Sequence, residues 1–465
     1  MQQPALRSPD VYAADVRAAI TGRVIVPDDV DYDESRQVFN AAIDRHPALI
    51  VRPADAADVS FLVTFARERG LELAVRSGGH NMAGFGTSDA GIVIDLSDMR
   101  GLDIDPGRRT AWAQPGLTAG EYTSAAARHG LATGFGDTGT VGIAGITLGG
   151  GIGWLVRKHG LTIDDLLAVE IVTADGALLR ADAETHPDLF WAVRGGGGNF
   201  GVVTRLQYRL HPVDTILGGM LILPATPEIL RAVVTVADEA PDELTTIAHL
   251  SALPPLPFVP PEHHGQLGLI VSVVYAGDVN AGQRAVAPLR ALATPLVDAI
   301  KPMSYPQMYE EEGGPPDRPK VVVRSAFLDD VDDRTAKTIV EQVRSAPPPM
   351  AMAQVRVLGG AMARVPVDAT AFPHRDRRMV ITMGALHMGP GDLAPQEAWV
   401  DDFVSALRPA ASGAFVNFMG AEGDARVREA YPGATYERLA AVKRRYDPTN
   451  LFRLNQNIPP ATAAA

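Results

Sequence analysis

A chain of 465 residues exceeds the size of one ordinary domain, so its length predicts two or three domains. Its 46% hydrophobic and 21% charged residues are typical of a globular protein, and its net charge of −13 argues against a nucleic-acid partner. It has no cysteine, no apolar run long enough to span a bilayer and no signal-peptide pattern, so we expect a cytoplasmic protein without disulfides or thiolate sites.

The first part of the chain predicts helices that alternate with short strands. Between Pro53 and Gly70, apolar residues recur at helical spacing, and the terminal glycine is typical of a helix end. Short apolar or β-branched runs predict strands, and an Asp-Gly pair between two such runs predicts a hairpin. The other elements expected here are strands over 73–75 and 91–96, a helix over 117–130 with Thr118 as its N-cap, and a hairpin over 169–180 that turns at Asp175-Gly176.

From about residue 211, longer apolar strands alternate with helices. This alternation predicts an antiparallel sheet with helices on one face, in a domain of its own. The elements expected are strands over 268–275 and 320–327, helices over 227–238 and 283–292, a proline-rich loop over 254–261 and a last helix over 435–445.

The loop that leaves the strand at 73–75 is the first segment that suggests chemistry. It has the sequence Arg76-Ser77-Gly78-Gly79-His80. Adjacent glycines let a backbone approach a ligand and offer its N–H groups to an anion such as a pyrophosphate. His80 then brings an imidazole, which is nucleophilic in its neutral form, beside whatever the loop binds. An ordinary turn with a hydrogen-bonded histidine explains the same residues, so the loop alone decides nothing.

Glycines also crowd the segment from Gly136 to Gly153. It contains Thr140-Val141-Gly142-Ile143-Ala144-Gly145 and then Leu148-Gly149-Gly150-Gly151. So many glycines disfavour a helix or a central strand and favour a backbone wrapped closely around a flat, phosphate-bearing cofactor. A flexible linker is the alternative, but linkers are rich in polar residues, and this segment holds Val, Ile and Leu and ends beside Trp154.

A third glycine cluster matches the dinucleotide fingerprint Gly-x-Gly-x-x-Gly at Gly196, Gly198 and Gly201. A Rossmann site needs a strand before this fingerprint and a helix after it. Here a helix is predicted over 187–193 and a strand over 202–208, so the order is reversed and we interpret the match as chance.

Two further segments of the sequence are rich in polar residues. Near the C-terminus, Tyr446-Asp447-Pro448-Thr449-Asn450-Leu451-Phe452 precedes Asn455 and Asn457. Polar amides at the end of a domain usually cap turns, so alone they indicate no chemistry. Glu262-His263-His264 adjoins a proline-rich loop and lacks the spacing of helical metal ligands, so we expect a solvated loop and no metal site.

In combination, these motifs resemble the berberine-bridge-enzyme-like FAD-linked oxidoreductases, which belong to the vanillyl-alcohol-oxidase-type FAD superfamily. The resemblance extends from about residue 33 to residue 458 and is strongest to the bacterial branch that includes 6-hydroxy-D-nicotine oxidase. The segments that carry it stand in the family's order: residues 76–80, residues 140–153, Phe190 to Thr204 and Tyr446 to Phe452, with Ala371-Phe372-Pro373-His374-Arg375 as a further similarity to that branch.

The resemblance implies an α+β fold of two domains. An FAD-binding domain would comprise residues 1–210 and be completed by residues 414–465. Residues 211–413 would form the substrate-binding domain, whose antiparallel sheet, covered by helices, roofs the flavin ring.

The same resemblance implies FAD bonded covalently to His80 through the 8α-methyl group of the flavin. Many relatives carry a second bond from a cysteine, but Thr138 stands about where that cysteine would be, so only the bond to His80 is expected. Val141 matches the position that controls oxygen access in relatives, and a small valine suits an oxidase. The residues expected to bind FAD are Arg76, Ser77, Gly78, Gly79, His80, Asn81, Gly84, Thr140, Val141, Gly142, Gly145, Gly149, Gly150, Gly153, Val203, Asn455 and Asn457.

The activity implied is that of an oxidase for a small organic substrate, either a secondary alcohol or a cyclic amine. The substrate would give a hydride to the flavin N5, and oxygen would restore the flavin and yield hydrogen peroxide. His374 is the candidate proton acceptor, and Asn417 and Tyr309 are expected beside the substrate. Relatives often place tyrosines where this chain has Phe415 and Phe418, which removes the usual phenol bases.

Two alternatives stay open. A flavin dehydrogenase of the same fold would pass electrons to another acceptor, and a catalytically degenerate protein would bind flavin without turning over a substrate. The partners expected are the substrate and oxygen, with no nucleic acid and no membrane. The sequence predicts no oligomeric state.

Overall fold

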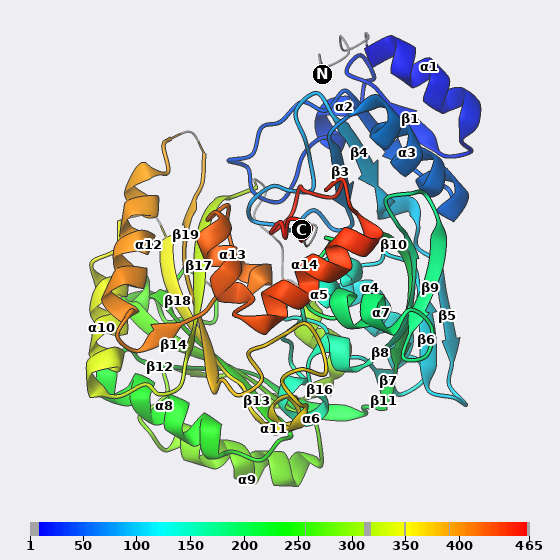
Figure 1. Cartoon of the computed structure of the whole chain (residues 1–465). Helices are drawn as coiled ribbons and strands as arrows, with labels where there is room; N and C mark the ends of the chain where they lie inside the picture. The colour runs from blue at the N-terminus through cyan, green and yellow to red at the C-terminus, as the bar shows by residue number, and fades with distance from the viewer. Residues whose placement is uncertain (1–8, 256, 311–317, 348–349, 390, 463–465) are drawn as a thin grey trace.

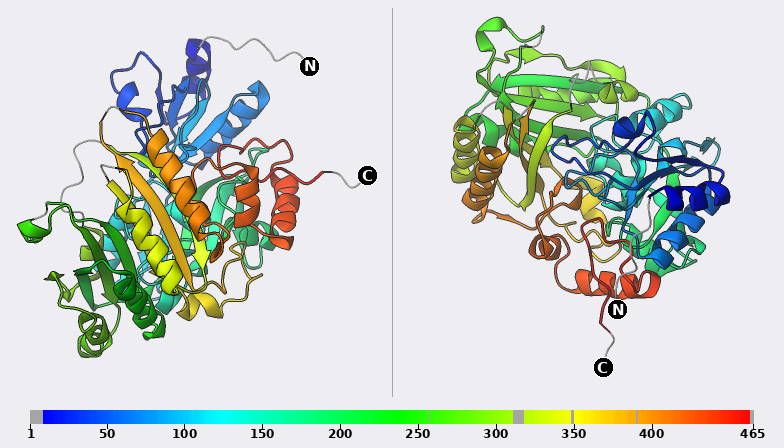
Figure 2. Two further views of the ribbon diagram at one scale, coloured as in Figure 1. Left: turned by 90° about the vertical axis from the view of Figure 1, so that its left-hand side faces the viewer. Right: turned by 90° about the horizontal axis from the view of Figure 1, so that it is seen from above.

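The chain forms two bodies that lie side by side (Figures 1 and 2). The computed structural model describes residues 9–462, except for 256, 311–317, 348–349 and 390. The N-terminal part and the last helices make up one body, and the middle of the chain makes up the other. Within these described ranges, no helix combines the length and the apolar character needed to cross a membrane.

The N-terminal body begins with a four-stranded sheet of order β1-β2-β4-β3, in which β2, β4 and β3 run parallel. Helix α3 (Ala56–Arg69) packs beside it. The Asp55 side chain caps this helix by accepting from the N–H groups of Ala57 and Asp58, and Gly70 ends it at a φ of +64°. This confirms the predicted helix. The other elements here are α1 (Pro9–Ala19), β1 (Arg23–Ile25), α2 (Tyr32–Ser35), β2 (Leu49–Arg52), β3 (Leu73–Arg76), β4 (Ile92–Asp95) and η1 (Leu96–Asp98).

A five-stranded antiparallel sheet of order β5-β6-β10-β8-β9 follows. Strands β8 and β9 form the predicted hairpin around Asp175-Gly176, and Thr118 forms a capping box with Glu121 at the start of α4. Both expectations are confirmed. The elements are β5 (Leu102–Asp105), β6 (Thr110–Ala113), α4 (Ala119–Ala127), β8 (Leu166–Val172), β9 (Leu178–Asp182), α7 (Pro187–Val193) and β10 (Val202–Arg209), with the small pair β7 (Leu131–Ala132) and β11 (His211–Pro212).

The glycine-rich segment contains a helix that the sequence did not predict. Helix α5 (Ile143–Leu148) is six residues long, with Gly142 at its N-cap and Gly149 after its last turn. The expectation that this segment avoids helix was therefore wrong for these residues. Burial of Ile143 and Leu148 outweighs the weak helix propensity, and the flanking glycines let the chain turn in and out. The short elements beyond it are α6 (Val156–His159) and η2 (Thr162–Asp164).

The middle of the chain forms a nine-stranded sheet of order β15-β12-β14-β13-β18-β19-β17-β20, with β16 also paired to β12. All its pairs are antiparallel, as predicted. Helices cover its outer face, where they share a core with the strands (Figure 1). The strands are β12 (Thr215–Pro224), β13 (Leu244–Ala252), β14 (Leu267–Tyr275), β15 (Val297–Asp298), β16 (Lys301–Ser304), β17 (Lys320–Leu328), β18 (Met350–Val357), β19 (Met379–His387) and β20 (Ala411–Ser412). The helices are α8 (Pro227–Glu239), α9 (Val279–Arg290), α10 (Asp333–Arg344) and α12 (Ala394–Leu407), with the short η3 (Pro261–His263), η4 (Tyr305–Tyr309) and α11 (Gly360–Arg364) elsewhere.

The C-terminal segment returns to the N-terminal body through η5 (Val416–Phe418), α13 (Asp424–Ala430) and α14 (Ala434–Tyr446). Lys443 in α14 is fully buried and donates to the carbonyl oxygens of Asn199 and Phe452, each at 2.7 Å. Its partner is Asp447 at 2.7 Å, although burial still lowers the pKa of Lys443 to about 8. The motif around Asp447-Pro448 therefore fastens the end of the chain to the glycine loop before β10.

Candidate active site

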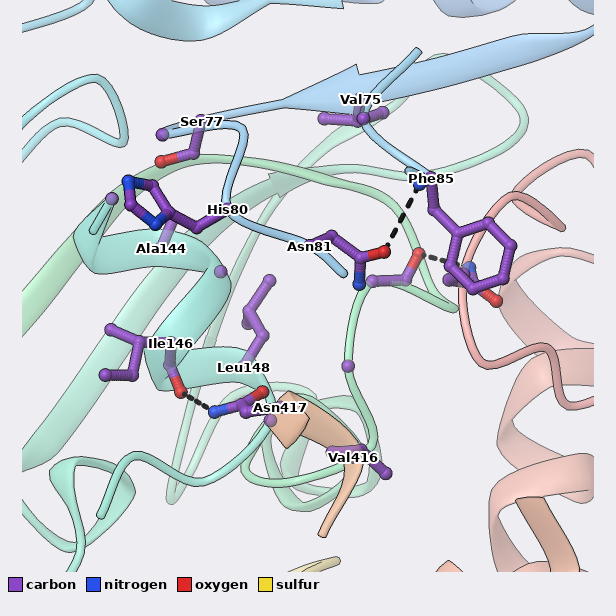
Figure 3. Close-up of a pocket in the computed structure, with 18 of the residues that line it drawn as sticks. Val75, Ser77, His80, Asn81, Phe85, Ala144, Ile146, Leu148, Val416 and Asn417 are labelled. Carbon is purple, nitrogen blue, oxygen red and sulfur yellow. Dashed lines mark hydrogen bonds between the residues drawn. The ribbon is translucent and has the colours of Figure 1, made fainter. Parts of the chain in front are cut away.

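A cavity of about 360 Å³ lies where the N-terminal body meets the C-terminal segment (Figure 3). Its size is that of a small-molecule or cofactor site. Glycine-rich motifs far apart in the sequence meet on its wall, as the sequence predicts. Most of the lining residues come from the segments 75–82, 136–149, 196–203, 415–418 and 452–456, and Phe39 is among the others.

His80 lies on this wall at the end of the loop that leaves β3. Its imidazole is half-buried, and desolvation lowers its pKa from 6.5 to about 4. The ring is therefore neutral near pH 7, which is the nucleophilic form. It stacks on Phe39, with ring centroids 4.6 Å apart and planes at 19°.

Arg76 also lines the cavity, but its charged guanidinium group is bonded to other residues of the protein. The buried guanidinium bonds Asp95 at 2.9 Å and donates to the carbonyl oxygens of Ser35 and Gln37. Burial alone would raise the pKa of Asp95, yet Arg76 and Arg52 lower it overall. Arg76 therefore supports the loop from behind instead of offering its charge to a ligand.

Two of the predicted glycines permit a contact between loops. A Cβ atom on Gly78 would lie 2.3 Å from the backbone nitrogen of Gly142, and a Cβ on Gly142 would lie 2.3 Å from that of Gly78. Only glycine at both positions lets the His80 loop touch the start of α5. At Gly145 and Gly198, in contrast, an added Cβ meets no atom within 4 Å, because both face open space in the cavity.

Asn417 and Asn81 line the cavity, and each side-chain amide already makes hydrogen bonds within the protein. The Asn417 amide nitrogen donates to the carbonyl of Ile146 in α5 at 2.9 Å, which ties the C-terminal segment to that helix (Figure 3). Asn81 Oδ1 accepts from the N–H groups of Ala83 and Phe85 and so closes the turn after His80.

The structure brings most of the predicted cofactor residues to one wall and leaves others out. Those that line the cavity are Arg76, Ser77, Gly78, Gly79, His80, Asn81, Val141, Gly142, Gly145, Gly149, Val203 and Asn455. Those that do not are Gly84, Thr140, Gly150, Gly153 and Asn457. Gly153 serves chain packing, because a Cβ there would lie 1.4 Å from the Phe135 oxygen, and Thr140 is exposed.

His374, the expected proton acceptor, lies outside the residues that line the cavity. Its ring is buried against Phe327 with centroids 4.3 Å apart, and its Nε2 lies 3.0 Å from the Ala430 carbonyl oxygen. Desolvation lowers its pKa to about 4. Packing between strand β17 and helix α13 has enclosed this side chain in the core, which no local pattern could reveal.

Tyr309 is likewise placed behind the wall and not on it. Its hydroxyl lies 2.9 Å from that of Tyr305 and donates to the carbonyl oxygens of Phe135 at 3.3 Å and Gly136 at 3.2 Å. Burial raises the pKa of Tyr309 further above its usual value. Through these bonds Tyr309, expected beside the substrate, holds the loop before Thr138.

Asp137 is a cavity residue that the sequence analysis missed. It is the only carboxylate among the described residues that line the cavity. Its Oδ2 accepts from Nη2 of Arg356, a buried residue of β18, at 2.7 Å. The two residues are 219 positions apart, so no motif could have connected them.

The glycines that match the dinucleotide fingerprint are further cavity residues that the sequence analysis did not expect. They lie between α7 and β10, the reversed order that was predicted, yet Gly196 and Gly198 line the cavity.

The whole chain has relatives among flavoproteins. It matches a family model described as FAD binding domain over residues 47–182 and one described as berberine and berberine like over residues 414–459. It is 31% identical to (R)-6-hydroxynicotine oxidase of Paenarthrobacter nicotinovorans over 95% of this chain and 97% of that protein. It is also 31% identical to the uncharacterized FAD-linked oxidoreductase YgaK of Bacillus subtilis over 96% and 98%.

The chain belongs to the berberine-bridge-enzyme-like family of FAD-linked oxidoreductases. The crystal structure of 6-hydroxy-D-nicotine oxidase from Arthrobacter nicotinovorans, at 30% identity, has a TM-score of 0.85 over 95% of this chain and 98% of that one. Xylooligosaccharide oxidase from Myceliophthora thermophila, at 22% identity, shares the fold with a TM-score of 0.87 over 98% and 100% of the two chains. The two-domain α+β prediction is thereby confirmed.

The cavity of this FAD-linked oxidoreductase fits its cofactor. Gly145 and Gly198 leave open the space that side chains would fill, and backbone N–H groups of glycine loops suit a pyrophosphate. Asn455 Oδ1 is buried at the cavity without a hydrogen-bond partner in the part of the chain that the structure describes, so it is available to a ligand. Among the same residues, no cluster of histidine or acidic side chains could hold a metal ion.

Proposed function

We propose that this FAD-dependent oxidoreductase is an oxidase that carries FAD covalently, through His80 only. The observation that supports the link is a neutral imidazole on the cavity wall, held beside the glycine loops that suit FAD. A bond to a single residue follows from Thr138, which lines the cavity where relatives place a cysteine, and from the absence of cysteine in the chain.

The substrate class proposed is a small secondary alcohol or cyclic amine. When bound, FAD supplies a two-electron acceptor that takes a hydride from the substrate and is restored by oxygen, which leaves as hydrogen peroxide. Much of the remaining wall is apolar, with Ile146, Leu148, Phe415 and Phe418, which disfavours water beside a bound substrate.

Asp137 replaces His374 as the proposed proton acceptor for an alcohol. It lies on the cavity wall, and Arg356 fixes its Oδ2 at 2.7 Å, which leaves Oδ1 to accept the hydroxyl proton. Oδ1 also accepts from Thr138 Oγ1, at 3.4 Å. A neutral amine has no hydroxyl proton to give up when it is oxidised, so an amine would need Asp137 less than an alcohol does.

The covalent link is tested by precipitating the purified yellow protein with acid. A pellet that stays yellow, with the mass of FAD on the peptide that contains His80, supports the proposal. Flavin that passes into the supernatant contradicts the link and leaves a dissociable cofactor.

Oxygen use is tested separately, because a dehydrogenase of this fold would bind FAD equally well. Val141 lines the cavity, and its small side chain is the basis for proposing an oxidase. Stoichiometric oxygen consumption and peroxide formation during turnover support the oxidase. Turnover only with an artificial electron acceptor would indicate a dehydrogenase, and a flavin that no substrate bleaches under nitrogen would indicate a degenerate protein.

A further inference from the structure

The residues from Ser35 to Ala41 form a segment that lies between the His80 loop and the large sheet. From the loop side, Arg76 donates to the carbonyl oxygens of Ser35 and Gln37. Phe39 N–H donates to the carbonyl oxygen of Gly79, next to His80, at 3.0 Å. The segment is therefore attached to the loop at Phe39 and at two residues before it.

Asn40 attaches the same segment to the other body. Its amide nitrogen donates to the carbonyl oxygens of Met82 and Val321, each at 3.0 Å, and its Oδ1 accepts from the N–H of Val321 at 3.0 Å. Val321 belongs to β17 of the nine-stranded sheet. The backbone that presents Phe39 is thus fixed from two directions by buried hydrogen bonds.

The Phe39 ring covers one face of the His80 imidazole. The centroids are 4.6 Å apart, the planes differ by 19°, and both side chains line the cavity. Rotation of a histidine ring about χ2 has broad, shallow minima, so packing decides the plane in which the ring nitrogens point. Bond formation requires one nitrogen to approach a carbon in a narrow range of directions. A ring stacked on His80 restricts this rotation.

We propose that Phe39 is the positioning residue that orients the His80 imidazole for its bond to FAD. The inference rests on the proposed covalent link. In that step a bond forms between an imidazole nitrogen and the 8α-carbon, while one N–H and one C–H bond break. Two protons and two electrons are removed, and oxygen takes them up as hydrogen peroxide. Phe39 takes no part in the electron transfer and acts only on the direction of the nitrogen.

The test follows the rate of covalent attachment. Full-length protein produced under riboflavin limitation is mixed with FAD in aerated buffer, and samples are precipitated with acid over time to measure flavin in the pellet. The variants are Phe39→Leu, which removes the aromatic face, and Phe39→Tyr, which keeps it. Phe61→Leu is the matched control, because Phe61 is a half-buried phenylalanine of α3 that packs on Phe65 and does not line the cavity.

Phe39→Leu is expected to slow attachment about 3- to 10-fold, the factor that corresponds to the loss of one aromatic contact. Phe39→Tyr and Phe61→Leu should stay within about 2-fold of the wild type. Reversible FAD binding, measured by fluorescence quenching before attachment, should be the same in all four proteins.

Three results overturn the inference. Phe39→Leu that attaches FAD at the wild-type rate shows that the stack is irrelevant. Phe39→Leu that loses reversible FAD binding in proportion to the rate shows that Phe39 serves binding in general. A wild type that releases all its flavin into acid overturns the His80 link itself and the inference with it, whereas the first two results leave the link intact.

Discussion

His80 and His374 occupy similar surroundings in two different regions of the molecule. Each imidazole stacks on a phenylalanine, Phe39 or Phe327, and desolvation lowers the pKa of each to about 4. They differ in access: His80 lines the cavity, whereas the Nε2–H of His374 is directed at the Ala430 carbonyl oxygen 3.0 Å away. A neutral, packed histidine is thus no sign of chemistry unless one of its nitrogens faces a ligand.

The largest expected effect separates these two histidines directly. His80→Ala should abolish covalent flavin, so that acid leaves a colourless pellet, because the chain then has no nucleophile in the loop. His374→Leu, the matched variant, should keep the wild-type amount of covalent flavin. Acid precipitation followed by peptide mass measurement gives the answer for both. Covalent flavin in His80→Ala would mean that another residue forms the bond.

A second comparison sets Asp137, which lines the cavity, against Tyr309, which lies behind it. Asp137→Asn should slow flavin reduction by an alcohol about 100-fold, the usual contribution of a proton acceptor. Tyr309→Phe should change the rate only a few-fold. Stopped-flow bleaching under nitrogen, with an alcohol that reduces the wild-type flavin, measures both rates. Equal rates in Asp137→Asn and the wild type would remove Asp137 from the reaction.

The smallest effect concerns stability in acid. Because the pKa of His374 is lowered from 6.5 to about 4 in the folded protein, the unfolded chain binds the extra proton between these values. The free energy of unfolding should therefore decrease as the pH falls from about 6.5 to 4, by up to about 3 kcal/mol from this residue. Below about pH 4 this contribution no longer changes.

His374→Phe tests this dependence, since phenylalanine keeps the stack on Phe327 and cannot titrate. It should cost about 1 kcal/mol at pH 7.5, for the lost hydrogen bond to Ala430, and lose less stability than the wild type on transfer to pH 4.5. Urea unfolding at the two pH values measures the difference. An identical loss in both proteins would show that other groups, such as His159 and His249, dominate the acid response.

Local signals made part of the fold predictable. The helix ended by Gly70, the Thr118 cap and the turn at Asp175-Gly176 depend on a few neighbouring residues, and the structure has all three. Helix α5 was missed because its stability depends on burial of Ile143 and Leu148 and not on propensity. Helix α5 therefore depends on tertiary packing, which cannot be read from the sequence.

The candidate site likewise has features that local motifs predict and features that depend on tertiary structure. The glycine motifs made the cavity predictable, because two backbone segments can approach each other closely only where both have glycine, as at Gly78 and Gly142. The ion pair of Asp137 and Arg356, and the stack of Phe39 on His80, join residues that no motif links. Their detection required the three-dimensional arrangement, as did the position of His374 outside the cavity lining.

The buried contact of Lys443 with the Asn199 carbonyl has a consequence for biosynthesis. The wall of the cavity includes residues near 455, whereas His80 is made almost four hundred residues earlier. While the ribosome is still translating the middle of the chain, the early sheets therefore lack the part that closes over the cofactor. We expect that FAD is acquired only after the residues near 455 have left the ribosome, and that a chain truncated before Lys443 accumulates without its yellow colour.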